Sequence, residues 1–143
     1  MEGLIKHLVK PIVTVPYSMN IAGVAVTMNL NSSHCVLVEH YDGSLGIVTE
    51  KDIVRDVVAL CKEPSSVRAW EVMKQPVIMV DENISIVEAI EIMKTHKIRN
   101  LIVKSGEEIT GVVKRSKILN SLKLVEERKS QWMRRQPAIP QTT

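Results

Sequence analysis

The feature that most constrains this chain is an internal repeat. Shifted by 65 residues, the sequence aligns with itself without a gap over most of its length. Self-similarity at a fixed spacing indicates a repeated structural unit, and here the length allows two copies. Identical residues pair across the copies as Pro11/Pro76, Val15/Val80, Ile21/Ile86, Met28/Met93, Val38/Val103, Gly46/Gly111, Val48/Val113 and Ile53/Ile118.

Each copy shows the same alternation of apolar patterns. Short apolar runs predict strands near 12–15, at 34–39 and 45–49, and again at 77–80, 100–104 and 109–114. Apolar residues at helical spacing predict helices over 19–30, 50–61, 86–97 and from 115 onward. Asn83 or Ser85 is the expected N-cap of the third helix. The predicted order is therefore β-α-β-β-α, twice.

These elements predict an α/β (α+β) fold made of two β-α-β-β-α repeats packed with pseudo-twofold symmetry. A three-stranded sheet with both helices on one face leaves its other face bare, and a second copy can cover it. The clefts between copies would be bordered by strand-to-helix junctions, which favour phosphate. The predicted boundaries are 5–62 for the first repeat, 63–72 for a linker, 73–128 for the second repeat, and 129–143 for a helix end and frayed tail.

Composition narrows the function classes. The chain is 45% hydrophobic but only 3% aromatic and contains no Phe, so its core must consist of aliphatic residues and Met. No apolar run approaches a membrane span, and the two cysteines form no disulfide framework, so we expect a cytoplasmic protein without membrane association. The stretch 114–135 carries eight basic and two acidic residues, whereas the rest of the chain has a net charge of −3.

One motif points to a ligand. The stretch "GIVTEKD" at 46–52 follows the pattern Gly-apolar-x-Thr/Ser-x-x-Asp at a predicted strand-to-helix junction. With the duplicated β-α-β-β-α pattern, it resembles a tandem pair of cystathionine-β-synthase (CBS) domains, a Bateman module, over residues 5 to 125. The resemblance implies a regulatory module that binds an adenosine-based nucleotide, with AMP favoured and ADP, ATP or S-adenosylmethionine as alternatives. It also implies a homodimer that reports to a regulated protein partner, which the sequence does not identify.

The same resemblance implies the site residues. Thr49 and Asp52 would serve the nucleotide's ribose or phosphate, although the pair also suits a helix cap and a favourable first-turn charge. The nucleotide-binding set is Thr49, Lys51, Asp52, Met73, Ile78, Ile98, Arg99 and Asn100. The second copy departs from the motif, with Lys114 and Lys117 where the first has Thr49 and Asp52. A second cleft of His34, Lys114 and Lys117 would be empty, adapted to a more anionic ligand, or merely a solvated basic surface.

Other functions have weaker support. No arrangement of a nucleophile and a base predicts catalysis, no histidine spacing predicts a metal site, and no cofactor is expected, so we expect no enzyme activity. The basic C-terminal segment leaves nucleic-acid binding as an alternative. A structural dimer with vestigial clefts is the third possibility.

Overall fold

The computed structural model describes residues 3–135, without the side chains of residues 124 and 125. It contains two three-stranded sheets, in the orders β1-β2-β3 and β4-β5-β6. The strands are β1 Thr14–Pro16, β2 Cys35–Glu39, β3 Leu45–Thr49, β4 Met79–Asp81, β5 Asn100–Ser105 and β6 Glu108–Lys114. The helices are α1 Ile21–Leu30, α2 Glu50–Ile53, α3 Ala69–Val72, α4 Ile86–His96 and α5 Arg115–Arg135. A π-helical stretch, η2 Val54–Val58, continues α2, and two short 3₁₀ turns, η1 Ile5–Leu8 and η3 Pro64–Ser66, complete the set.

Strand register follows the 65-residue repeat. In each sheet the first strand runs parallel to the second, and the second runs antiparallel to the third. Equivalent residues occupy equivalent positions, as in Thr14 opposite Leu37 and Met79 opposite Ile102, or Val36 opposite Val48 and Leu101 opposite Val113. The predicted fold class and the β-α-β-β-α order of both copies are confirmed. Ser85, not Asn83, caps α4, accepting a hydrogen bond from the Glu88 amide at 3.1 Å.

Three apolar clusters hold the fold together. The first lies between α1, η2 and the first sheet, and the second lies between α4, α5 and the second sheet. The third lies between the two sheets and is centred on Cys35, Leu37, Ile102 and Val112, all buried. The bare face of each sheet is therefore covered by the other copy, as the sequence predicts.

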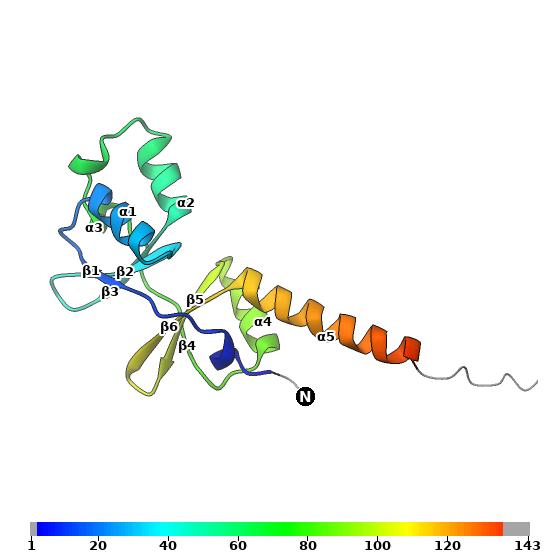
Figure 1. Cartoon of the computed structure of the whole chain (residues 1–143). Helices are drawn as coiled ribbons and strands as arrows, with labels where there is room; N and C mark the ends of the chain where they lie inside the picture. The colour runs from blue at the N-terminus through cyan, green and yellow to red at the C-terminus, as the bar shows by residue number, and fades with distance from the viewer. Residues whose placement is uncertain (1–2, 136–143) are drawn as a thin grey trace, which may run out of the picture.

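The segment that leads into each repeat packs on the other repeat. Near the N-terminus, Ile5 is fully buried in the second cluster, and the Lys10 amide donates to the Val112 carbonyl at 2.9 Å. Correspondingly, the predicted linker packs on the first repeat: the Val67 carbonyl accepts from the Ile21 amide at 2.8 Å. Figure 1 shows the blue N-terminal segment crossing from the second repeat to β1. The predicted sequence boundaries stay a prediction, but the segment 63–72 is not a free linker.

The packing of each leading segment on the other repeat explains why the motif begins with a glycine, Gly46, and why the equivalent residue of the second repeat is also a glycine, Gly111. A Cβ at Gly46 would lie 2.5 Å from Sδ of Met73. A Cβ at Gly111 would lie 2.0 Å from the Lys10 carbonyl oxygen, which belongs to the backbone and has little freedom to move away. Because neither glycine has a side chain, there is room for the segments that cross from one repeat to the other, at Met73 and at Lys10.

We predict that Gly111→Ala lowers the free energy of unfolding by about 3 kcal/mol, because the new methyl group meets the Lys10 backbone. Gly106→Ala is the matched control. Both glycines have a positive φ, 154° at Gly111 and 61° at Gly106. A methyl group added at Gly106 would meet nothing within 4 Å, so we expect a loss of about 1 kcal/mol there. Urea denaturation of both variants measures the difference. Equal losses would contradict the close-approach explanation.

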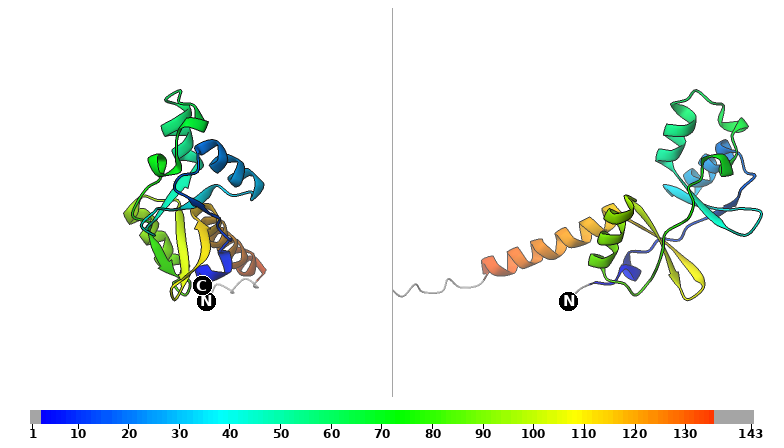
Figure 2. Two further views of the ribbon diagram at one scale, coloured as in Figure 1. Left: turned by 90° about the vertical axis from the view of Figure 1, so that its left-hand side faces the viewer. Right: turned by 180° about the vertical axis from the view of Figure 1, so that it is seen from behind.

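The last helix leaves the body of the molecule. Figures 1 and 2 show the C-terminal part of α5 projecting away from both repeats. Trp132 and Met133 near its end are 60% and 66% exposed. Within residues 3–135, no helix is long and apolar enough to cross a membrane. The predicted frayed tail, 136–143, lies outside the described residues.

Candidate functional site

A pocket of about 560 Å³ lies where the strand-to-helix junctions of the two repeats meet. The first repeat contributes the end of β3 and the start of α2, and the second contributes the loop before β5 and the start of α5. Its lining residues are His34, Ile47, Thr49, Glu50, Lys51, Asp52, Lys74, Lys97, Ile98, Arg99, Asn100, Lys114, Arg115, Ser116 and Leu119. The pocket thus joins two groups of residues that are far apart in the sequence.

Most of the predicted nucleotide-binding residues meet in this pocket. Its lining includes Thr49, Lys51, Asp52, Ile98, Arg99 and Asn100. Met73 and Ile78 do not line it: Met73 covers Gly46 beside the first apolar cluster, and Ile78 packs against the second. Their predicted place among the nucleotide-binding residues stays a prediction.

Two of the three residues predicted for a second cleft lie at this same pocket. His34 and Lys114 line the same pocket as Thr49 and Asp52. Lys117 is exposed and does not line it. The motif position of the second copy therefore faces the first copy's motif across one shared space.

Thr49 and Asp52 bind each other. The Thr49 amide donates to Oδ2 of Asp52 at 2.9 Å, and the Asp52 amide donates to Oγ1 of Thr49 at 3.2 Å. This reciprocal pair is a capping box at the start of α2. The cap function considered from the sequence is therefore present, and a ligand role would be additional to it.

The second carboxylate oxygen of Asp52 is also engaged. Oδ1 accepts from Arg55 at 2.9 Å and lies 3.3 Å from Nζ of Lys74. Asp52 is only 1% exposed, so these contacts and the cap compensate for the burial of its charge. Hydrogen bonds to Asp56 and then to Asp52 raise the pKa of Arg55 above its usual range. Any ligand hydroxyl that reaches Oδ1 must share it with Arg55 or Lys74.

Because it caps α2 and pairs with two cations, Asp52 should matter for stability more than a simple first-turn charge, which contributes about 0.3–1 kcal/mol. We predict that Asp52→Ala lowers the free energy of unfolding by about 2 kcal/mol, measured by urea denaturation. The control is Glu50→Ala, in the same helical turn but exposed, which should cost less than about 1 kcal/mol. Equal, small losses would show that the capping box contributes little.

Asn100 carries an unsatisfied atom at the pocket. Its Oδ1 is buried and has no hydrogen-bond partner among the described residues. Buried polar atoms are nearly always paired, and an unpaired one costs about 1–3 kcal/mol. An orphan acceptor beside a pocket is a place where a ligand's hydroxyl or amino group would be stabilised.

Several lining residues were missed from the sequence. They include Lys74, Lys97, Arg115, Ser116 and Leu119. Lys74 reaches the pocket because the predicted linker packs on the first repeat, and Lys97 ends α4 in a left-handed conformation with φ 54°. Leu119 is 40% exposed at the pocket. A signal for Arg115 and Ser116 existed, because they follow Lys114 as Glu50 and Lys51 follow Thr49.

His34 lies at the pocket, and Cys35 is buried between the two sheets. Nδ1 of His34 lies 3.1 Å from Oε1 of Glu50 at an exposed position. Burial raises the pKa of the Cys35 thiol to about 11, so the group stays protonated at neutral pH. Among residues 3–135 there is no cluster of three or more metal-ligating side chains.

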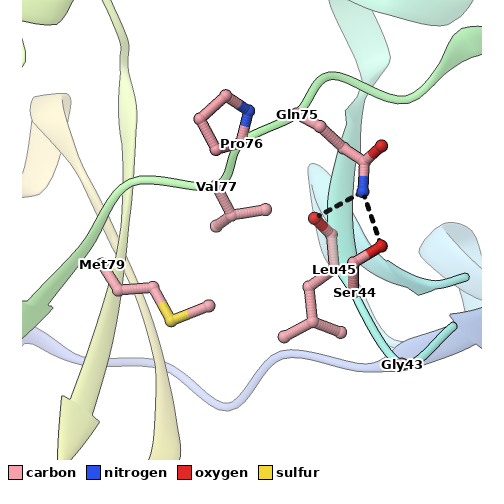
Figure 3. A pocket seen from close by; sticks show the side chains of 7 residues that line it. All are labelled: Gly43, Ser44, Leu45, Gln75, Pro76, Val77 and Met79. Carbon is pink, nitrogen blue, oxygen red and sulfur yellow. Dashed lines mark hydrogen bonds between the residues drawn. The ribbon is translucent and has the colours of Figure 1, made fainter.

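A second hollow, of about 610 Å³, lies beside the crossing segment (Figure 3). It is open and contains no charged side chain: the lining residues are Gly43, Ser44, Leu45, Gln75, Pro76, Val77 and Met79. Nε2 of Gln75 donates to Oγ of Ser44 and to the Leu45 carbonyl, both at 3.1 Å. These contacts tie Gln75, in the segment before β4, to the first repeat.

Comparison with known proteins agrees with this architecture. The family model for the CBS domain matches residues 5–59 and 69–124, one match for each repeat. The chain belongs to the CBS domain family. Among solved structures, a hexameric CBS-CP12 protein from bloom-forming cyanobacteria is 27% identical with a TM-score of 0.80, covering 88% of this chain and 75% of that one.

Two further relatives extend the comparison. The CBS domain protein PAE2072 from Pyrobaculum aerophilum, solved in complex with AMP, is 25% identical with a TM-score of 0.70, covering 85% of this chain and 99% of that one. MK0525 from Methanopyrus kandleri is 40% identical over 85 residues, which are 59% of this chain and 43% of that protein. The chain spans about half the length of the curated relatives it matches.

Proposed function

We propose that this CBS pair is a regulatory module, not an enzyme, that binds an adenosine-based nucleotide in the pocket between its repeats and signals to a protein partner. The observation that carries the proposal is the meeting of Thr49 and Asp52 from one repeat with Ile98, Arg99 and Asn100 from the other. The AMP complex of the Pyrobaculum aerophilum relative supports an adenine nucleotide as the ligand.

The pocket residues suggest how such a ligand would be held. Ile98 and Leu119 offer apolar surface to a purine, and the Asp52 carboxylate offers an acceptor to ribose hydroxyls. Lys51 and Arg99 offer cations to phosphate. The Asn100 acceptor would gain the partner that it lacks.

The same contacts suggest how binding would be transmitted. Lys74, which pairs with Asp52, belongs to the segment that leads into the second repeat. A ribose hydroxyl at Oδ1 of Asp52 would weaken that pair and leave Lys74 to bind phosphate instead. The ligand would thereby replace the contact between Lys74 and Asp52 with contacts of both residues to the ligand. A protein partner that prefers the resulting angle between the two repeats would respond to the nucleotide.

The Asn100→Ala variant tests the proposal, because ligand binding and stability should change in opposite directions. Removing a buried, unpaired acceptor should leave the melting temperature of the free protein unchanged or higher. If Asn100 contacts the nucleotide, binding should weaken by about tenfold, the equivalent of one hydrogen bond. Calorimetry with AMP, ADP and ATP measures affinity, and differential scanning fluorimetry measures stability.

Asn120→Ala is the control, since Asn120 is exposed on α5 outside the pocket lining. The parent should melt at a higher temperature with saturating adenine nucleotide, by a margin equivalent to about 2.7 kcal/mol at one hundred times the dissociation constant. Absence of any shift with AMP, ADP, ATP or S-adenosylmethionine at millimolar concentration would overturn the proposal.

We further propose that two copies form a homodimer in the cytoplasm. Five apolar side chains on α1 and the end of the first repeat are between 57% and 78% exposed: Val26, Leu30, Val54, Val58 and Leu60. Apolar side chains gathered on neighbouring helices are typical of a contact surface. The hexameric state of the cyanobacterial relative supports association of CBS pairs.

Val58→Glu places a charge in this surface, and we predict that it yields monomers where the parent has the mass of two chains. Light scattering after size exclusion measures the mass. Tyr41→Glu is the matched control, because Tyr41 is 76% exposed in the turn between β2 and β3, away from those helices. A monomeric parent, or a Val58→Glu dimer, would contradict the proposed interface.

Nucleic-acid binding has lost part of its support. Two cations of the basic C-terminal stretch, Lys114 and Arg115, line the pocket between the repeats. The others, from Lys117 to Arg135, are exposed along α5. That alternative stays a prediction and no observation favours it over the nucleotide.

A further inference from the structure

The pocket between the repeats contains more positive charge than a nucleoside monophosphate needs. Its lining has two carboxylates, Glu50 and Asp52, and six cations: Lys51, Lys74, Lys97, Arg99, Lys114 and Arg115. With His34 neutral, the lining has a net charge of +4, whereas the whole chain has +3. The rest of the protein is therefore slightly acidic in sum, and this one cavity accounts for the net positive charge of the chain.

Most of these cations are not neutralised inside the protein. Among the described residues, Lys74 pairs with Asp52, but no carboxylate lies within 4.0 Å of a charged nitrogen of Lys51, Lys97, Arg99, Lys114 or Arg115. Like charges gathered around a concave space raise its potential and attract an anion of matching charge. The five unpaired cations come from both repeats, so an anion that satisfies them must extend across the pocket.

The backbone conformation of Lys97 is a second observation, separate from the charge of the pocket. It ends α4 in the left-handed conformation, with φ 54°, where glycine is the favoured residue. The equivalent position in the first repeat, Ser32, is also left-handed, with φ 49°, but carries a short uncharged side chain. The second repeat therefore has a strained lysine at the helix end that borders the pocket.

The two halves of the pocket also differ in chemistry. At the motif position the first repeat presents a hydroxyl and a carboxylate, Thr49 and Asp52, which suit the hydroxyl groups of a sugar. The second repeat presents Lys114 there, followed by Arg115 at the start of the long helix α5. Cations and a helix N-terminus suit phosphate and do not suit a second ribose.

We propose that the pocket takes one ligand with a chain of three or more phosphoryl groups, whose phosphates extend from Lys51 and Arg99 to Lys97, Lys114 and Arg115. This proposal rests on the proposed function for the nucleoside end, at Thr49 and Asp52. A triphosphate chain carries about four negative charges at neutral pH, which matches the pocket lining, whereas a monophosphate leaves about half of the positive charge unpaired. Lys97 and Lys114 are then the residues that select for phosphate-chain length.

Calorimetry on the full chain tests the proposal, without divalent cations, which would neutralise phosphate charge. The probes are AMP, ADP, ATP, inorganic orthophosphate and inorganic tripolyphosphate. We expect affinity to rise at least about tenfold from AMP to ATP, one ATP to bind per chain, and tripolyphosphate to bind measurably where orthophosphate does not. Raising the salt concentration should weaken ATP more than AMP.

Two variants locate the phosphate chain. Lys97→Gly removes the charge and relieves the left-handed strain, so the protein should fold at least as stably as the parent. Lys114→Thr installs the first repeat's residue in the second. Each should weaken ATP by about tenfold and AMP by less than about twofold. Lys62→Ala, which removes the same charge from an exposed position outside the pocket, should change neither affinity.

The outcomes separate this proposal from the proposed function. AMP and ATP binding equally tightly, two ATP per chain, or variants that weaken AMP and ATP alike would overturn the phosphate-chain proposal and leave the nucleotide module standing. Tripolyphosphate binding as tightly as ATP would support the phosphate-chain site and overturn recognition of the nucleoside. Binding of no probe would overturn both.

Discussion

The contact between the two sheets is the constraint on which the rest of the structure depends. Each sheet has helices on one face only, and its other face consists of aliphatic residues with Cys35 that water would otherwise reach. Burying Leu37 and Ile102 against each other's sheet removes that apolar area from water and sets the two repeats face to face. Once the sheets are opposed, the ends of β3 and β6 and the helices that follow them lie at the same edge of the contact, which creates the pocket.

The crossing segments reinforce this arrangement. The N-terminal turn places Ile5 in the cluster of the second repeat, and the segment before β4 places Val67, Ala69 and Val72 in the cluster of the first, so neither apolar cluster is complete without residues from outside its own repeat. A repeat separated from the other would lose both its sheet contact and its share of a helical cluster. The two copies therefore share their apolar clusters despite their separate sequence patterns.

Much of this fold could be predicted because the signals were periodic or duplicated. The 65-residue shift predicted two equivalent sheets, and the pairing of Thr14 with Leu37 and of Met79 with Ile102 follows it. The packing of 63–72 could not be predicted in the same way, because Pro64 and two serines have the composition of a loop while Val67 and Ala69 are buried by tertiary contacts. Local composition reflects a segment's own conformational preferences and does not show which other parts of the chain pack against it.

The candidate site could likewise be predicted only in part from the sequence. A motif and a resemblance brought Thr49, Asp52, Arg99 and Asn100 into one set, and the structure places all four around one pocket. The second cleft was an inference from symmetry and stays a prediction, and two of its residues, His34 and Lys114, line this same pocket. Lys74 and Lys97 were not anticipated, since one depends on the path of the crossing segment and the other on the left-handed end of α4.

The position of Asp52 explains why one carboxylate can serve both stability and regulation. A buried charge must be compensated at all times, and in the free protein the amide of Thr49 and the cations of Arg55 and Lys74 provide that compensation. The amide and Arg55 come from the same repeat as Asp52, so a ligand can leave them in place. Of these three partners, Lys74 connects Asp52 to the segment that leads into the other repeat. Its side chain is 61% exposed, so water screens its pairing with Asp52 and releasing it costs little free energy. A ligand hydroxyl that replaces Lys74 would therefore keep the cap and the local helix intact while changing only the contact that joins the two repeats.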